Sequence, residues 1–406
     1  MQRRTKTQLT RGALVAATAL LSTAAFAAGN YGPGASDTEI KIGNTMPYSG
    51  PASAYGTIGK GVAAYFDMVN ANGGINGRKI NFVSRDDGYS PPKTVEQVRK
   101  LVEQDQVLFL FNNLGTPTNT SIHKYINAKK VPHLFLATGA GKWGNPKKYP
   151  WTMGWQPTYP GEAKVYATYI RKNMPNAKIA ILYQNDDYGK DYLNGFVEGL
   201  GDMNSAIVSK LPYEATDPTV DSQIIKLKDT GADVFFNITT PKFAAQAIRK
   251  AYDIGWKPTH FLNNVSSSVG SVLKPAGLEK SKGVITALYT KDPTDPQWAD
   301  DEDYKAWTAW MDKYYAGGDK TSSFNVFAYA AAYTMAEVIK NAGDELTREN
   351  IMKQAASLTD LKVPMLLPGV TVDTSADDFY PIECEQLGQF DGKKWTLIGE
   401  TICPEN

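Results

Sequence analysis

Short apolar runs alternate with longer segments of helical periodicity along most of the chain. Runs of this kind are typical of buried strands, and helical patterns of ~10–15 residues are long enough to connect parallel strands. The first series predicts strands at 40–45, 79–84, 107–111 and 133–136, with helices at 55–69, 92–103 and 118–129. This alternation indicates βαβ units and a parallel sheet.

The same alternation restarts after Pro157. The second series predicts strands at 178–183, 207–211, 234–238 and 260–262, with helices at 161–172, 189–200, 220–229 and 243–252. Two successive series of this kind predict an α/β protein with two doubly wound lobes.

The last third of the chain has a different pattern. Three helical patterns follow one another at 298–315, 325–341 and 348–358, and the middle one has so little polar face that we expect it to be buried. An Asp391-Gly392 turn followed by a strand pattern at 393–398 predicts a terminal hairpin.

The N-terminal segment has the pattern of a secretory signal peptide. Basic residues from Arg3 to Arg11 precede an apolar run at 12–26, and Ala25-Phe26-Ala27 fits the cleavage rule. We therefore predict a signal peptide at residues 1–27 and export to the periplasm, with a buried N-terminal helix as the alternative. No later stretch has about 18 consecutive apolar residues, so we expect no membrane span after the cleavage site.

The amino-acid composition excludes several classes of ligand and metal site. The 406 residues are 42% hydrophobic and 21% charged with a net charge of +1, which is typical of a globular protein and gives no electrostatic reason to bind nucleic acid. Three histidines and two cysteines exclude a four-cysteine zinc site and an iron–sulfur cluster held by cysteine alone, so no metal or cofactor is expected. Because a cysteine pair in an oxidising compartment is more often bridged than free, we predict a disulfide between Cys384 and Cys403 that joins the arms of the hairpin; two free thiols are the alternative.

Two loops repeat the same helix start beyond a predicted strand. Gly115-Thr116-Pro117-Thr118 follows the strand at 107–111, and Thr239-Thr240-Pro241-Lys242 follows the strand at 234–238. Thr is a good N-cap and Pro is favoured at the first helical position, so each helix should begin with free N–H groups that attract anions. Ligands of open parallel sheets bind beyond the carboxyl ends of the strands. The pair therefore predicts one cleft between the lobes, with ordinary helix capping as the alternative.

Catalytic motifs are absent or weak. The sequence has no Gly-x-Ser-x-Gly elbow, Walker A motif or dinucleotide fingerprint. The carboxylate pairs Asp86-Asp87 and Asp186-Asp187 follow strands and could serve acid–base chemistry, but turn and cap hydrogen bonds explain them more simply. We therefore expect a cleft without catalytic residues, and a cleft enzyme that uses these pairs remains an alternative.

Several motifs together resemble one known family. They are Ile40-Lys41-Ile42-Gly43, Pro47-Tyr48-Ser49-Gly50-Pro51, Ile75-Asn76-Gly77-Arg78-Lys79-Ile80, Asp86-Asp87 and Gln184-Asn185-Asp186-Asp187-Tyr188-Gly189. With them the chain resembles the type I periplasmic solute-binding proteins of ABC importers, in the leucine/isoleucine/valine-binding group. The resemblance implies two lobes joined by a hinge of three crossings, a monomer, and delivery of a ligand to the membrane subunits of an ABC permease. It divides the chain into an N-terminal lobe at 37–156 plus 290–362 and a C-terminal lobe at 157–289 plus 363–406.

The resemblance also implies a ligand site. A ligand carboxylate would be held by hydroxyl and backbone groups, and further contacts would come from tyrosines and from the second lobe. The residues that match these roles are Thr116, Ala137, Thr138 and Gly139 for the carboxylate, Tyr55 and Tyr188 for the aromatic walls, and Thr239, Thr240 and Asn264 in the second lobe.

One departure from the family concerns the second lobe. Amino-acid-binding members place an acid in the loop after a second-lobe strand, to pair the ligand ammonium, but this loop reads Leu262-Asn263-Asn264-Val265-Ser266. A buried ammonium without an anionic partner is costly. We therefore predict a small carboxylate with an apolar or aromatic body, such as an aromatic acid. An amino-acid ligand paired by another acid, such as Asp87, and a sensory rather than a transport role remain alternatives.

Overall fold

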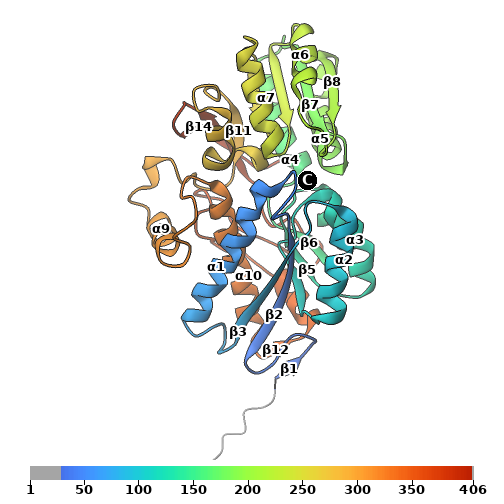
Figure 1. Ribbon diagram of the computed structural model, residues 1–406, viewed down its shortest axis with the longest axis vertical. Coiled ribbons are helices and arrows are strands. Elements are labelled where there is room, and N and C mark those ends of the chain that lie inside the picture. Colours follow the sequence, from blue (N-terminus) through green and yellow to red (C-terminus); the bar gives the residue numbers. More distant parts are fainter. Residues whose placement is uncertain (1–28, 405–406) are drawn as a thin grey trace, which may run out of the picture.

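The structure is a computed structural model that describes residues 29–404, and its strands form two main sheets arranged along the long axis (Figure 1). The predicted signal peptide lies outside the described residues. Within them, no helix is long and apolar enough to cross a membrane.

The first lobe, at the bottom of Figure 1, has a parallel sheet in the order β3-β2-β4-β5-β6. Most residues of β2, β4, β5 and β6 are buried, as expected for a parallel sheet covered on both faces, and Ile40 and Ile42 are fully buried. The strands are β2 Glu39–Met46, β3 Lys79–Asp86, β4 Phe109–Phe111, β5 His133–Leu136 and β6 Thr152–Gly154, and the helices that follow them are α1 Gly56–Ala71, α2 Pro91–Arg99 and α3 Thr116–Ala128.

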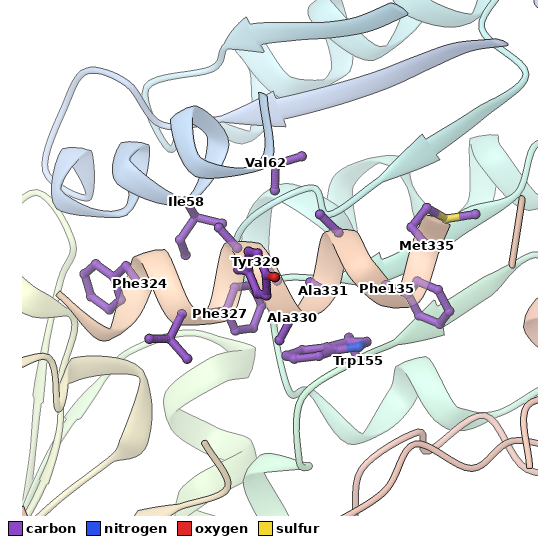
Figure 2. Close-up of a cluster of buried hydrophobic side chains, with 14 of the residues drawn as sticks. Ile58, Val62, Phe135, Trp155, Phe324, Phe327, Tyr329, Ala330, Ala331 and Met335 are labelled. Carbon is purple, nitrogen blue, oxygen red and sulfur yellow. The ribbon is translucent and has the colours of Figure 1, made fainter. Parts of the chain in front are cut away.

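Three helices from late in the sequence complete this region: α9 Glu302–Tyr314, α10 Ser323–Ala342 and α11 Arg348–Ala355. α10 is buried, as its apolar pattern predicts, and it packs against α1 (Figure 2). The small residues explain the close approach, because a Cβ at Gly61 of α1 would lie 2.7 Å from the Cβ of Ala328. Phe324 and Phe327 continue the buried face of α10 towards the second lobe (Figure 2).

The second lobe has a sheet in the order β14-β13-β11-β10-β9-β7-β8. Five strands are parallel, and the terminal hairpin adds two antiparallel strands at one edge. The strands are β7 Ile179–Gln184, β8 Ile207–Tyr213, β9 Val234–Ile238, β10 Thr259–Leu262, β11 Ile285–Leu288, β13 Glu385–Phe390 and β14 Trp395–Ile402; the helices are α4 Tyr159–Asn173, α5 Asp187–Leu200, α6 Asp221–Asp229, α7 Pro241–Asp253 and the short α8 Lys274–Ala276.

The chain passes between the lobes three times, after β6, after β11 and between α11 and β13. The second and third crossings lie side by side: the Lys291 N–H donates to the Met365 carbonyl at 2.8 Å, and the Leu367 N–H donates to the Tyr289 carbonyl at 2.9 Å. The two-lobed α/β fold is therefore as predicted. The lobe boundaries at 156/157, 289/290 and 362/363 stay predictions, since the sheets do not fix single residues within the crossings.

Two strands of the main sheets were not predicted, β6 and β11. β6 has only three residues, too few for a clear period, and the short apolar run of β11 is interrupted by Thr286. The helix predicted from residue 298 begins at Glu302, because Pro296–Trp298 forms a separate 3₁₀ turn.

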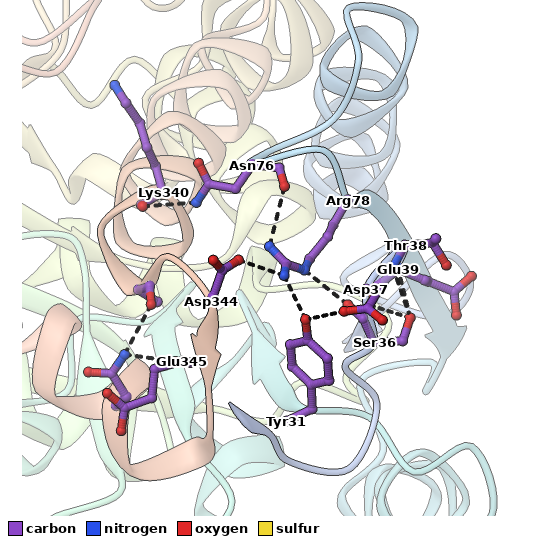
Figure 3. A network of polar contacts seen from close by, with 12 residues as sticks. Tyr31, Ser36, Asp37, Thr38, Glu39, Asn76, Arg78, Lys340, Asp344 and Glu345 are labelled. Atoms are coloured by element: carbon purple, nitrogen blue, oxygen red, sulfur yellow. Dashed lines mark hydrogen bonds and ion pairs between the residues drawn. The ribbon is translucent and has the colours of Figure 1, made fainter. Parts of the chain in front are cut away.

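A polar cluster around Arg78 ties the start of the described chain to the end of α10 (Figure 3). The guanidinium donates to the Ser36 carbonyl at 3.0 Å and to the Tyr31 hydroxyl at 2.8 Å, and it forms an ion pair with Asp344 at 2.7 Å. β1 Asn30–Tyr31 also pairs with β12 Glu345–Leu346. The Ile75–Ile80 motif therefore has a structural role in this fold.

Cys384 and Cys403 are joined by a disulfide. They flank the open end of the β13–β14 hairpin, so the bond connects the two arms. A closed loop of this size stabilises the fold by roughly 3 kcal/mol in the chain-entropy account.

Candidate functional site

A cavity lies between the lobes, at the carboxyl ends of the parallel strands of both sheets. Its empty volume is about 740 Å³, counting the space that opens to solvent. This size suits a small organic ligand.

The first-lobe wall comes from the loop after β3, from α1 and from the start of α3. Tyr55, Ile58, Tyr89 and Thr116 line it. Gly115 precedes α3 with a φ of 98°, and a Cβ there would lie 2.6 Å from the ring of Tyr89 and 2.7 Å from the Thr118 hydroxyl. Glycine is required at this position for both reasons, and its absence of a side chain lets Tyr89 close against the helix start.

The second-lobe wall comes from the starts of α4, α5 and α7 and from the loop after β10. Tyr159, Tyr188, Thr240 and Asn264 line it. The Thr240 N–H donates to the Tyr213 hydroxyl at 3.0 Å, and the Asn263 amide donates to the Tyr188 hydroxyl at 2.8 Å. These bonds hold the wall in place from behind.

The crossings and α10 supply the rest of the lining: Gln156, Leu288, Tyr289, Thr290, Asp292, Ser323, Phe324 and Phe327. Most of the surface is therefore aromatic or apolar. Burial raises the pKa of Tyr159 to about 12, and it raises the pKa of Tyr55, Tyr89 and Tyr188 well above the ordinary value. Their phenols are neutral at any physiological pH and can donate or accept hydrogen bonds.

Charge is sparse in the cavity. Among the described lining residues there is no Lys, Arg or His, and Asp292 is the only acid. Asp292 is 4% exposed, and both hydrogen bonds from Thr294 go to its Oδ1. Burial raises the pKa of Asp292 to about 6. Its second oxygen, Oδ2, accepts no hydrogen bond from the residues that the structure describes.

The residues proposed for the site from sequence divide into two groups. Tyr55, Thr116, Ala137, Tyr188, Thr240 and Asn264 line the cavity, whereas Thr138, Gly139 and Thr239 do not. Thr138 lies behind Thr116, and their hydroxyls are 2.6 Å apart. The Ala137 N–H donates to the Asn113 carbonyl at 3.1 Å, so it is not free to bind a ligand.

The two Thr-Pro helix starts differ from the predicted pattern in one respect. At α7, Thr240 is the N-cap and Pro241 the first helical residue, although the Thr240 side chain makes no capping bond. At α3, Gly115 is the N-cap and Thr116 is already helical. The prediction of a Thr N-cap is therefore wrong for α3, because only glycine fits the positive φ that the chain adopts there.

Sequence reasoning missed several lining residues, above all Gln156, Tyr159, Tyr289 and Asp292. Tyr159 could have been found, since Thr158-Tyr159-Pro160 is a third helix start with a Thr cap and an early Pro. Gln156, Tyr289 and Asp292 lie in the crossings, where no periodicity marks them.

The carboxylate pairs have structural roles and do not line the cavity. Asp87 accepts from the Tyr89 N–H at 3.0 Å and from the Thr94 hydroxyl at 2.8 Å. Asp186 caps α5 through the Gly189 N–H. The amino-acid alternative requires an acid such as Asp87 to reach the ligand. Asp87 does not line the cavity, so it does not fill this role.

Hydrogen bonds and an ion pair connect the lobes around the cavity. The Tyr55 hydroxyl donates to the Val265 carbonyl at 3.0 Å, and the Gln184 amide donates to the Tyr89 hydroxyl at 3.4 Å. Lys142 forms an ion pair with Asp187 at 2.6 Å. The lobes are thus in contact across the site.

Known proteins share this sequence pattern and this fold. A family model described as "Periplasmic binding protein" matches residues 39–394. The Leu/Ile/Val-binding protein homolog 7 of Brucella suis biovar 1 (strain 1330) is 25% identical over 282 residues, which are 68% of this chain and 69% of that protein.

Solved structures of several binding proteins have a similar fold. A substrate-binding periplasmic protein from Ralstonia solanacearum has a TM-score of 0.80 with 25% identity and covers 89% of this chain and 100% of its own. A branched chain amino acid ABC transporter from Thermus thermophilus with bound valine has a TM-score of 0.81 with 16% identity over 90% of this chain and 96% of its own, which shows a shared fold.

Proposed function

The chain belongs to the periplasmic binding protein family and is a solute-binding protein, and from that premise we propose that it captures a small carboxylate with an apolar or aromatic body and delivers it to the membrane subunits of an ABC importer. The proposed location is the periplasm, reached by cleavage after Ala27.

The observation that supports this ligand class is the start of α3 in an aromatic cavity. Thr116 presents a hydroxyl and the first N–H groups of a helix, and no basic side chain lies among the described lining residues. Helix N-termini and hydroxyls bind carboxylates without a lysine or arginine. The surrounding rings would then bury the apolar body of the ligand.

Calorimetric titration of the mature chain with benzoate tests the proposal. We expect saturable binding of benzoate and a higher melting temperature in its presence, since a ligand that binds only the folded state stabilises it. The variant Thr116→Val should bind benzoate more weakly than the wild type, while Thr239→Val, which lies outside the lining, is the matched control. Equal binding by Thr116→Val and the wild type would contradict the carboxylate position.

Asp292 favours a second candidate, an amino acid. The loop at 262–266 has no acid to pair with a ligand ammonium. The free Oδ2 of Asp292 could take this role. The matched pair of L-phenylalanine and 3-phenylpropionate differs only in the ammonium group. Tighter binding of phenylalanine, lost in Asp292→Asn, would support the amino acid; tighter binding of phenylpropionate would support the simple carboxylate.

A further inference from the structure

Two buried carboxyl groups lie behind the second-lobe wall and belong to no part of the site described so far. Glu162 of α4 is 1% exposed and Glu385 of β13 is 0% exposed. Neither has a Lys, Arg or His as an ion-pair partner among the described residues. Such groups are costly to bury unless hydrogen bonds or a proton compensate.

Glu162 is fully engaged as an acceptor. Its Oε1 accepts from the Asn264 N–H at 2.7 Å and from the Tyr166 hydroxyl at 2.7 Å, and its Oε2 accepts from the Tyr192 hydroxyl at 2.5 Å. Three donors favour the ionised carboxylate. One of these donors is the N–H of Asn264, a residue that lines the ligand cavity.

Glu385 is the opposite case. Neither of its carboxyl oxygens has a hydrogen-bond partner in the described chain. β13 places Gln386 opposite Leu288 of β11, and Leu288 and Tyr289 line the cavity. Glu385 therefore sits one residue closer to the first lobe, beside Tyr289.

The electrostatics agree with this geometry. Burial raises the pKa of both carboxyls, and the charge of Glu162 raises the pKa of Glu385 further. The titratable groups that face the pair are phenols: Tyr166 from α4, Tyr192 from α5 and Tyr289 after β11, all with pKa values raised by burial and by the carboxylates. Two neighbouring acids of this kind titrate as a pair that keeps one proton.

We infer that Glu162 is a positioning residue for the ligand-facing Asn264 loop, and that Glu385 still keeps a proton at pH 8, where Glu162 is ionised, so that the pair then carries a single negative charge. Protonation of Glu385 removes a charge that would otherwise be buried without a hydrogen-bond partner. Ionised Glu162 then holds the Asn264 backbone N–H. The side-chain amide of Asn264 is held separately, because it donates to the Ala287 carbonyl at 2.5 Å. Acidification that protonates Glu162 turns one acceptor into a donor and releases the loop.

The protonated carboxyl is tested without a ligand. Infrared spectra of the mature chain at pH 8, where Asp292 is ionised, should contain the carbonyl band of a buried carboxylic acid. We expect this band to disappear in Glu385→Gln and to persist in Glu400→Gln, an exposed acid on the adjacent β14. A spectrum without the band, or a band that survives Glu385→Gln, would overturn the assignment of the proton.

The positioning role is tested at the Asn264 amide. Its NMR signal should shift on acidification in the wild type and should not shift in Glu162→Gln, which keeps an acceptor but cannot titrate. Thermal melting checks that Glu162→Gln is folded before the two proteins are compared. An Asn264 signal that titrates equally in both proteins would overturn the inference.

The consequence for the ligand rests on the proposed function. The wild type and both variants are titrated with benzoate and with L-leucine at pH 8. Glu162→Ala should bind whichever of the two the wild type binds about tenfold more weakly, as expected for loss of a buried charged acceptor, whereas Glu385→Gln should bind it as the wild type does. Unchanged affinity in Glu162→Ala would contradict the positioning role. If neither probe binds the wild type, the ligand class is wrong, and the infrared band and the Asn264 signal still decide the inference.

Discussion

Helices α3 and α7 begin with the same Thr-Pro pair, each beyond a strand of its own lobe, but their first turns have different surroundings. α3 brings Gly115 and Thr116 to the cavity, with the Thr116 hydroxyl supported by Thr138. At α7 the phenol of Tyr213 accepts the Thr240 N–H and donates to Gln184 at 3.0 Å. A dipeptide can therefore start a helix, while residues distant in sequence decide which of its N–H groups a ligand can reach.

The largest expected effect is at the α3 start. Gly115→Ala forces a Cβ against Tyr89 at a positive φ, and we expect the free energy of unfolding to fall by about 3 kcal/mol. Gly231→Ala is the matched control, since its φ is 70° but nothing lies within 4 Å, and it should cost about 1 kcal/mol. Chemical denaturation measures both. Equal losses in the two variants would mean that the close approach of Tyr89 is not the reason why glycine is required at the start of α3.

Asp292 tests whether the cavity beside α3 holds an unpaired charge. A carboxyl whose pKa is higher in the folded chain than in the unfolded chain binds its proton more tightly when folded, so its contribution to stability is lost as the pH rises from about 4 to about 6. Asp292→Asn should therefore stabilise the ligand-free chain by up to about 3 kcal/mol at pH 7, and the gain should vanish below pH 4. A gain that is independent of pH would contradict the buried charge.

A substitution of Tyr213 tests whether its hydroxyl stabilises the start of α7. Tyr213→Phe leaves the buried Thr240 N–H and the Gln184 carbonyl oxygen without this hydroxyl, and we expect a loss of about 2 kcal/mol in unfolding free energy. Tyr55→Phe removes a hydroxyl that bridges the lobes and should cost less, because opening the lobes lets water replace that bond. Denaturation curves of the two variants would contradict this account if Tyr55→Phe were the more damaging.

The smallest expected effect compares the two threonines directly. Thr116→Val should weaken benzoate binding about tenfold, the value of one hydrogen bond to a charged group. Thr240→Val should weaken it less than about threefold, because the Tyr213 hydroxyl already accepts the Thr240 N–H and makes the start of α7 a poorer carboxylate site. Calorimetry at one pH separates the two. A larger loss at Thr240 would reverse the assignment of the carboxylate end.

The sequence predicted those parts of the molecule that depend on local pattern. The strand at 133–136 and the buried helix around Ala328–Ala332 were found because periodicity and apolar content specify them within one segment. Thr116, Tyr55 and Tyr188 were placed in the site through strand ends and family motifs. These features need no knowledge of the partner lobe.

The parts that were not predicted depend on contacts between distant segments. Asp292 follows a four-residue strand and enters the cavity only because the second crossing turns there. Glu162 and Glu385 are separated by most of the second lobe in sequence, and each alone reads as an ordinary surface acid. The Gly115 N-cap was missed because a positive φ depends on the space that Tyr89 occupies.

The bond between Cys384 and Cys403 has a consequence for the export that we propose for this chain. Thiols stay reduced in the cytoplasm, so a precursor there lacks the link that closes the terminal hairpin. We expect the reduced second lobe to unfold more readily than the oxidised one, which favours passage through a translocation channel that accepts only unfolded chains. In the proposed export, oxidation after transport would then stabilise the fold, so that the same two residues would leave the chain easy to unfold before transport and harder to unfold after it.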